Sequence, residues 1–192
     1  MKRRRAPDAG GPGQGGTILA PDAARPPAIT VRTAAAAHDG QIAAIWNREI
    51  ACAVTTTDTQ PRDPAAQRRW REAHGDGHPV LVAVAGDEVL AFGALTAYRA
   101  KPAFAHTVEN SIYVRQDCRD RGLGALVLGA LLGRARAAGH RSVLARITSE
   151  NAASIALHAR AGFRLVGVER EVAFKLDRWL DVTVMQRMLA DG

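Results

Sequence analysis

The strongest chemical signal in the sequence is a short basic segment that ends in two glycines. The segment reads VRQDCRDRGLGA over residues 114–125, so Arg119 and Arg121 come directly before Gly122 and Gly124. A strand-like run precedes it and a helical pattern follows. The first turn of a helix carries unpaired N–H groups and the positive end of the helix dipole, and glycine lets a phosphate approach the backbone. The segment therefore predicts a site for a phosphate-bearing ligand.

Two familiar phosphate motifs do not fit this segment. It lacks the Gly-Lys-Ser/Thr ending of a P-loop, and it lacks the third glycine of the dinucleotide-binding fingerprint. The alternative interpretation is an ordinary glycine-containing turn between a strand and a helix, with no ligand. The motif by itself leaves both interpretations open.

A second polar cluster lies about 30 residues further on. Asn151, Ser154 and His158 occupy positions i, i+3 and i+7 of a predicted helix, so their side chains share one face. They could line a ligand site together. Alternatively, Asn151 only caps the helix and His158 is an ordinary surface or half-buried histidine.

The third candidate is an acidic residue inside a strand-like run, Glu109 in TVENSIYV. Period-two alternation places Glu109 on one face of the strand with Ser111 and Tyr113. The opposite face then carries Val108, Asn110, Ile112 and Val114. A carboxylate in a central strand is costly unless it is hydrogen-bonded or used in chemistry. The alternative is an exposed position at the edge of the sheet.

The elements that must position these residues follow from the hydrophobic periodicity. Strands are expected at 29–32, 80–85, 88–95, 107–114, 142–148, 163–168 and 180–185, and helices at 38–52, 65–73, 122–138 and 151–161. Gly86-Asp87 predicts a hairpin turn between two of the strands. The expected fold class is α/β (α+β), a mixed and largely antiparallel sheet with a few crossover helices.

Composition limits the class of protein. The chain has 192 residues, a net charge of +7 and two cysteines, and no run approaches the ~18 apolar residues of a membrane span. We therefore expect a soluble cytoplasmic protein without a disulfide scaffold. Residues 1–27 hold five glycines, five prolines and +3 of the net charge, which predicts a disordered basic tail before a single domain at 28–192. A nucleic-acid or membrane tether is the alternative role for this tail, but no aromatic residue interleaves its arginines.

The three motifs together, in this order and spacing, resemble a known family. RxxGxG at Arg119, Gly122 and Gly124, followed by N-x-x-S-x-x-x-H-x-x-x-G-F, is similar to the GCN5-related N-acetyltransferase (GNAT) superfamily. TVENSIYV, RDRGLG, NAASIALHARAGF and a final K-x-x-x-W-x-D at 175–181 more closely resemble the phosphinothricin and methionine sulfoximine/sulfone acetyltransferases. The resemblance extends over about residues 29–189.

The resemblance implies acetyl-CoA as the donor and a small amine as the acceptor, on a single GNAT-type domain. It implies that the diphosphate binds at the glycine turn, that the pantetheine pairs along the strand at 112–114, and that the polar helix face contacts the pantetheine arm. The implied cofactor-binding residues are Ile112, Tyr113, Val114, Arg119, Asp120, Arg121, Gly122, Leu123, Gly124, Ala125, Asn151 and Ser154.

The resemblance also assigns roles to four other side chains. Glu109 is the expected base and His158 is counted among the catalytic residues, while Arg99 and Lys101 occupy the place of paired basic residues that hold the substrate carboxylate. Lys101 stands where arginine is expected, which loses bidentate geometry. No metal is expected.

Other functions stay open at this level. An acceptor such as a protein N-terminus or an aminoglycoside would need an acidic pocket, which Arg99 and Lys101 disfavour. A non-catalytic acyl-CoA sensor would keep the glycine turn without needing Glu109. A homodimer is expected from the resemblance alone, and no membrane or nucleic-acid partner is expected.

Overall fold

The computed structural model of the protein describes residues 27–189. The predicted tail up to residue 26 lies outside the described residues. The strands are β1 (Ile29–Thr33), β2 (Val80–Ala85), β3 (Glu88–Ala97), β4 (Thr107–Val114), β5 (Ser142–Thr148), β6 (Arg164–Lys175) and β7 (Arg178–Met188). The helices are α1 (Asp39–Cys52), α2 (Pro64–Glu72), α3 (Leu123–Ala137) and α4 (Ala152–Arg160). In the described part of the chain, no helix has the length and apolar character to cross a bilayer.

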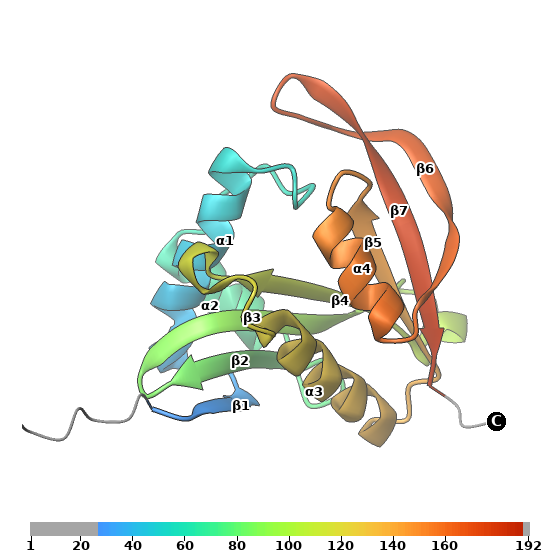
Figure 1. Cartoon of the computed structure of the whole chain (residues 1–192). Coiled ribbons are helices and arrows are strands. Elements are labelled where there is room, and N and C mark those ends of the chain that lie inside the picture. The colour runs from blue at the N-terminus through green and yellow to red at the C-terminus, as the bar shows by residue number, and fades with distance from the viewer. Residues whose placement is uncertain (1–26, 190–192) are drawn as a thin grey trace, which may run out of the picture.

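The strands form one seven-stranded sheet in the order β1-β2-β3-β4-β5-β7-β6 (Figure 1). Every neighbouring pair is antiparallel except β4 and β5, which are parallel because α3 crosses over between them. The expected mixed, mostly antiparallel sheet flanked by helices is therefore confirmed. β6 and β7 form a long hairpin at one edge, which extends beyond the rest of the sheet in Figure 1.

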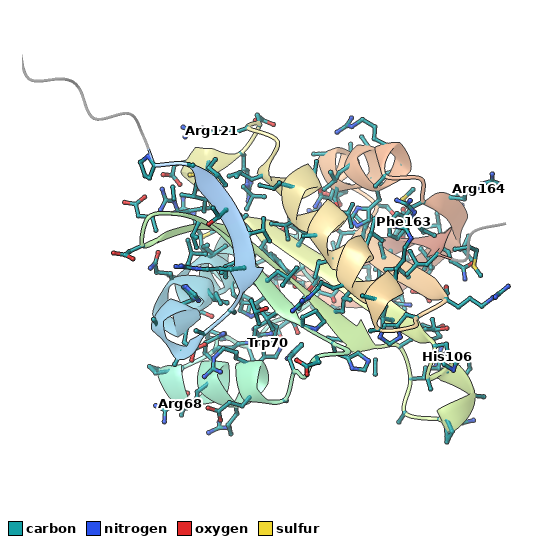
Figure 2. The ribbon with its side chains drawn as sticks, turned by 90° about the horizontal axis from the view of Figure 1, so that it is seen from below. Arg68, Trp70, His106, Arg121, Phe163 and Arg164 are labelled. Carbon is teal, nitrogen blue, oxygen red and sulfur yellow. The ribbon has the colours of Figure 1, made fainter. Side chains whose placement is uncertain are left out.

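Helices cover both faces of the sheet. Alternate residues of β2 show this, because Leu81 and Ala83 join the core beneath α3 while Val82 and Val84 join the core beneath α1. The predicted apolar stripe of α3 is confirmed, since all six of its residues are buried in the first core: Leu123, Val127, Leu128, Leu131, Leu132 and Ala135. Figure 2 shows α3 lying across the sheet on this face.

The two central strands separate part-way along their length. β4 pairs with β5 only from Thr107 to Asn110, opposite Ser142 to Ala145. Beyond Asn110, β4 continues to Val114 and stays paired with β3 alone, while β5 continues beside β7. The sheet is consequently open at its centre, and the residues predicted to do chemistry lie around this opening.

Two strands are much longer than the sequence predicts. β6 runs to Lys175 and β7 begins at Arg178, although the periodicity indicated strands only over 163–168 and 180–185. The reason is that β6 is an edge strand with little burial, so it has no clean apolar alternation, and its register shifts twice against β7. Short 3₁₀ turns at Pro102–Phe104 and Gln116–Cys118 were not predicted either.

Candidate active site

A cavity of about 670 Å³ opens where β4 and β5 separate. Its wall is formed by β4, β5, the loops before α3 and α4, α1, and the hairpin of β6 and β7. Thirteen of the predicted site residues line it: Glu109, Ile112, Tyr113, Val114, Arg119, Asp120, Gly122, Leu123, Gly124, Ala125, Asn151, Ser154 and His158. Segments as far apart in the sequence as α1 and β7, which contribute Trp46 and Val182, thus line one cavity.

The glycine turn presents free backbone donors to this cavity. Gly122 is the N-cap of α3 with φ of +77°, a left-handed conformation that glycine adopts without strain, and no side chain caps the helix. The first intrahelical bond runs from Leu126 N to Gly122 O, which leaves the N–H groups of residues 123–125 unpaired in the helix. A Cβ on Gly124 would lie 3.1 Å from Leu157. The turn therefore combines helix-dipole charge with close access to the backbone.

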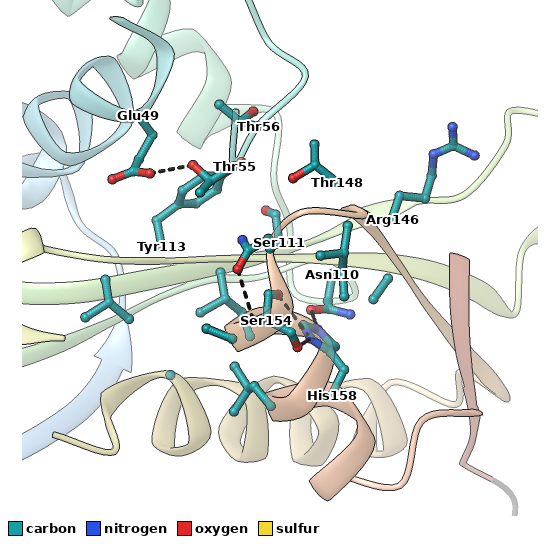
Figure 3. A pocket seen from close by; sticks show the side chains of 18 of the residues that line it. Glu49, Thr55, Thr56, Asn110, Ser111, Tyr113, Arg146, Thr148, Ser154 and His158 are labelled. Atoms are coloured by element: carbon teal, nitrogen blue, oxygen red, sulfur yellow. Dashed lines mark hydrogen bonds between the residues drawn. The ribbon is translucent and has the colours of Figure 1, made fainter. Parts of the chain in front are cut away.

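The two arginines before this turn differ in placement. Arg119 lines the cavity, and its guanidinium forms an ion pair with Glu49 of α1. The Glu49 carboxylate, which is buried, also accepts a hydrogen bond of 2.5 Å from Thr55 Oγ1 (Figure 3). Arg121 is exposed on the outside of the loop and does not line the cavity (Figure 2).

The polar face of α4 forms a hydrogen-bonded network. Asn151 caps the helix, because its Oδ1 accepts from Ser154 N at 3.0 Å. His158 Nε2 lies 3.0 Å from Asn110 Oδ1, and Nδ1 lies 2.8 Å from Ser154 O and 3.4 Å from Ser154 Oγ (Figure 3). Burial lowers the pKa of His158, and the hydrogen bond to the Ser154 backbone opposes this shift.

His158 is 3% exposed, and both of its ring nitrogens contact protein atoms. Neither nitrogen is free in this conformation to exchange a proton with a bound substrate. Asn110 in turn donates from Nδ2 to Leu144 O of β5 at 2.9 Å, at the last residue of β4 that pairs with β5. The histidine is therefore placed to hold α4 against the point where the two strands separate.

Glu109 lies on the opposite face of β4 from Asn110. It shares the α1 face with Tyr113, whose ring packs 4.9 Å from that of Trp46 and 5.1 Å from that of Phe92. Burial raises the pKa of Glu109, Arg146 opposes this shift, and Glu169 adds to it. Arg146 itself is paired with Glu169, with Nη1 2.8 Å from Oε1. A carboxylate with a raised pKa at the wall of a cavity is suited to accept a proton.

Arg99 and Lys101 are not brought to this cavity. They follow the end of β3 and line a separate cavity with Tyr98, Ala100 and Phe104. The Arg99 guanidinium lies 4.9 Å from the Tyr98 ring centroid, and Arg99 and Lys101 are exposed. Their role as a carboxylate clamp stays a prediction.

Sequence reasoning missed several residues of the wall. Glu49, Thr56, Arg62, Arg146 and Thr148 all line the cavity, and Thr148 Oγ1 is buried without a hydrogen-bond partner among the described residues. One signal was available for Glu49, because it falls on the apolar stripe of α1 beside Ile45 and Trp46. The others lie on loops or strands where single polar residues carry no pattern.

Comparison with known proteins decides the family. Residues 42–163 match the model of the acetyltransferase (GNAT) family. The chain belongs to this family. The matched region includes the glycine turn, Glu109 and the polar face of α4, so the features that line the cavity are those of an N-acetyltransferase.

Its relatives give the family relationship more detail. The GNAT chain is 42% identical over 159 residues to an L-methionine sulfoximine/L-methionine sulfone acetyltransferase of Pseudomonas paraeruginosa, covering 82% of this chain and 92% of the relative. It is 37% identical over 149 residues to a phosphinothricin N-acetyltransferase of Streptomyces coelicolor, covering 76% and 87%. A crystal structure of a phosphinothricin acetyltransferase from Sinorhizobium meliloti in complex with acetyl-CoA is similar with a TM-score of 0.81, at 35% identity over 85% of this chain and 90% of that one.

Proposed function

We propose that the protein transfers the acetyl group of acetyl-CoA to the amino group of a small amino acid or amino-acid analogue of the phosphinothricin and methionine sulfone type. The observation that carries the proposal is a single cavity joining a helix N-terminus with free N–H groups to a carboxylate of raised pKa. The names of the relatives support this acceptor class.

The donor half of the cavity suits coenzyme A. The free N–H groups at the start of α3 would donate hydrogen bonds to the diphosphate, and Arg119, which is paired with Glu49, lines the cavity beside them. The backbone at 112–114 has no β5 partner, so it offers hydrogen-bonding groups to the pantetheine amides. Asn151 and Ser154 line the same half and would contact the pantetheine arm.

The acceptor half lies on the α1 face around Glu109. Bound acetyl-CoA supplies the thioester, and only a neutral amine attacks it. Glu109 would take the proton from the ammonium group, directly or through one water. The basic side chains of the cavity wall would hold the acceptor amine beside the thioester. This proximity would contribute much of the rate enhancement. The deep placement of His158 favours support of the site over direct proton transfer.

The test is a screen for thiol release from acetyl-CoA with purified protein. Phosphinothricin, methionine sulfoximine and methionine sulfone should be acetylated faster than an aminoglycoside or a peptide N-terminus. A product of added mass 42 Da on the α-amine, seen by mass spectrometry, would identify the reaction. Tight acetyl-CoA binding with no turnover on any of these amines would contradict the proposal and favour a sensor.

We also infer that two copies associate in the cytoplasm through the hairpin of β6 and β7. This hairpin carries several exposed large apolar side chains, among them Leu165, Val166, Val168, Phe174, Trp179 and Met188. Exposed apolar patches of this kind mark interaction surfaces. Light scattering should give the mass of a dimer, and Val166→Glu should give a monomer; a monomeric wild type would contradict the inference.

A further inference from the structure

One cationic side chain of the cavity wall has no assigned role. Arg62 lies in the segment between α1 and α2, and its backbone is held from both sides by a single side chain. Asn47 Nδ2 donates to Arg62 O at 2.9 Å, and Arg62 N donates to Asn47 Oδ1 at 2.8 Å. This pair of bonds fixes where the arginine side chain leaves the loop.

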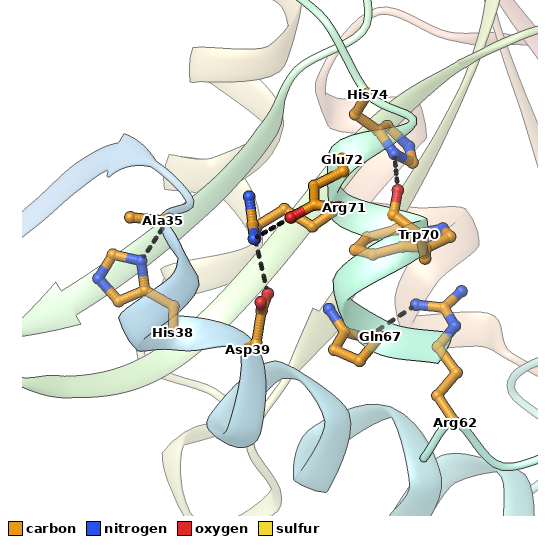
Figure 4. A network of polar contacts seen from close by, with 9 residues as sticks. All are labelled: Ala35, His38, Asp39, Arg62, Gln67, Trp70, Arg71, Glu72 and His74. Atoms are coloured by element: carbon orange, nitrogen blue, oxygen red, sulfur yellow. Dashed lines mark hydrogen bonds and ion pairs between the residues drawn. The ribbon is translucent and has the colours of Figure 1, made fainter. Parts of the chain in front are cut away.

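The guanidinium of Arg62 lies against two indole rings. Its Cζ is 3.6 Å from the centroid of Trp46 and 4.0 Å from that of Trp70. Figure 4 shows Arg62 beside Trp70, with the bond from Nη1 to Gln67 Oε1 of 3.4 Å. Both indoles and Arg62 line the main cavity. The charge is thus presented to the cavity by a rigid aromatic support.

Within residues 27–189, no carboxylate forms an ion pair with Arg62. Asp58 acts on the Arg62 charge without forming such a pair. Burial lowers the pKa of Arg62 to about 10, with Asp58 and Tyr113 opposing the shift, so the group stays cationic at neutral pH. A guanidinium has five N–H donors, and one long bond to Gln67 leaves most of them unused. A partly buried, unpaired charge is stabilised when an anion binds to it.

Arg62 and Glu109 line the same cavity, so one bound acceptor can meet both. The Arg62 charge interacts with Tyr113, which lies on the same face of β4 as Glu109 and four residues further along the strand. An amino acid whose amine faces Glu109 would therefore extend its side chain along this face towards Arg62.

We propose that Arg62 forms an anion subsite for the far end of the acceptor side chain, so that the enzyme prefers amino acids that carry a second, distal oxyanion such as a phosphinate. The inference rests on the proposed function. It adds that Arg62 determines which amino acids the enzyme prefers as acceptors. The Arg62 fork binds the two phosphinate oxygens, and Trp46 and Trp70 keep the fork in place. The neutral oxygens of a sulfone bind there more weakly, because they carry no net charge.

Steady-state kinetics of Arg62→Ala and Arg62→Lys test the subsite with three acceptors. Phosphinothricin has a distal phosphinate, methionine sulfone has neutral oxygens, and norleucine has none. Arg62→Ala should raise the KM of phosphinothricin about 30-fold or more, that of the sulfone a few-fold, and that of norleucine less than twofold. Arg62→Lys should raise the KM of phosphinothricin by an intermediate amount, because lysine keeps the charge and loses the bidentate hydrogen bonding of the guanidinium.

The matched control is Arg68→Ala, which removes an exposed arginine from α2 and should leave all three KM values unchanged. An equal rise for the three acceptors in Arg62→Ala would show that the residue only supports the fold, and no rise would exclude it from the site. Either result overturns the proposal. An unchanged KM for acetyl-CoA would exclude damage to the donor half.

A binding measurement separates this proposal from the proposed function. In a Trp179→Phe background, the remaining tryptophans are Trp46 and Trp70, which contact Arg62. Phosphinothricin without acetyl-CoA should change their fluorescence saturably, and Arg62→Ala should abolish the change. If binding occurs and no amino acid is acetylated, the proposed function fails and the subsite stands. If acetylation occurs and fluorescence does not respond, or responds equally in Arg62→Ala, the subsite fails.

Discussion

His158 and Asn110 meet at the point where β4 and β5 separate, with Nε2 of the histidine 3.0 Å from Oδ1 of the asparagine. Asn110 is the last residue of β4 that pairs with β5, and its Nδ2 bonds Leu144 O on β5. The two side chains therefore join α4 to both strands at the origin of the opening. In this arrangement, a buried polar network sets the width of a ligand site.

We expect His158→Ala to weaken this junction. The change leaves Asn110 Oδ1 without its partner and creates a cavity beside Phe163, whose ring centroid lies 4.9 Å from that of His158. The free energy of unfolding should fall by about 2–4 kcal/mol. The KM for acetyl-CoA should rise more than the KM for the acceptor. Chemical denaturation and steady-state kinetics measure both, and a fall in kcat alone would instead make His158 a catalytic residue.

The lowered pKa of His158 also predicts how stability depends on pH. The unfolded chain takes up a proton near the ordinary value of 6.5, and the folded chain does so only at a lower pH. The contribution of this residue is therefore complete above 6.5 and is lost as the pH falls towards the folded-state pKa. Thermal unfolding between pH 5 and 8 should show a shallower decline in His158→Asn than in the wild type. Parallel curves would contradict the assignment.

Glu109→Gln should lower kcat about 100-fold or more and change the KM of acetyl-CoA less than twofold. The substitution removes the proton acceptor and leaves the N-terminus of α3 intact. Because burial raises the pKa of Glu109, wild-type turnover should fall as the pH drops through that pKa, and this acidic limb should vanish in the variant. Full turnover of the glutamine variant at neutral pH would remove Glu109 from the reaction.

Arg99→Ala tests the clamp that the sequence predicts and that the structure places outside the main cavity. If the loop after β3 closes over the acceptor, the KM of methionine sulfone should rise about tenfold. The KM of the corresponding amine without the α-carboxylate should stay the same. An equal effect on the two acceptors would show that Arg99 does not bind the carboxylate.

Two glycines offer a matched pair for the packing of α3 against the sheet. A Cβ on Gly93 of β3 would lie 2.8 Å from Val127 and 2.9 Å from Ser111 O, whereas one on Gly129 of α3 would meet nothing. Gly93→Ala should therefore destabilise the protein by about 1–3 kcal/mol. Gly129→Ala should stabilise it by about 0.5–1 kcal/mol, because alanine favours the helix. The denaturant midpoints of the two variants measure both changes in stability. An unchanged midpoint for Gly93→Ala would mean that β3 and α3 are less tightly packed.

The central elements were predictable from the sequence because their patterns are local. β4 and β5 have the predicted bounds, and α3 and α4 agree to within one residue at each end. The strand-to-helix turn at Gly122 also follows from short-range rules, since a left-handed residue opening a helix favours glycine.

The missed features depend on contacts between distant segments. Glu49 meets Arg119 across 70 residues, and Lys175 Nζ reaches Thr56 O at 2.9 Å across 119 residues. The sequence pattern of α1 marks Glu49 only as a carboxylate on an apolar stripe. Arg62 lies in a loop with no periodicity, and only the three-dimensional structure shows its two indole contacts.

The four-residue contact between β4 and β5 leaves a free strand edge in the interior of the sheet instead of at its border. A free edge at the border invites another polypeptide, but this one lies between two halves of the same domain, where only a slender extended molecule fits. A donor bound there would join the halves as an additional strand. Amide hydrogen exchange at 112–114 should then slow when the donor binds. The stability of the domain would thus depend on whether the donor is bound.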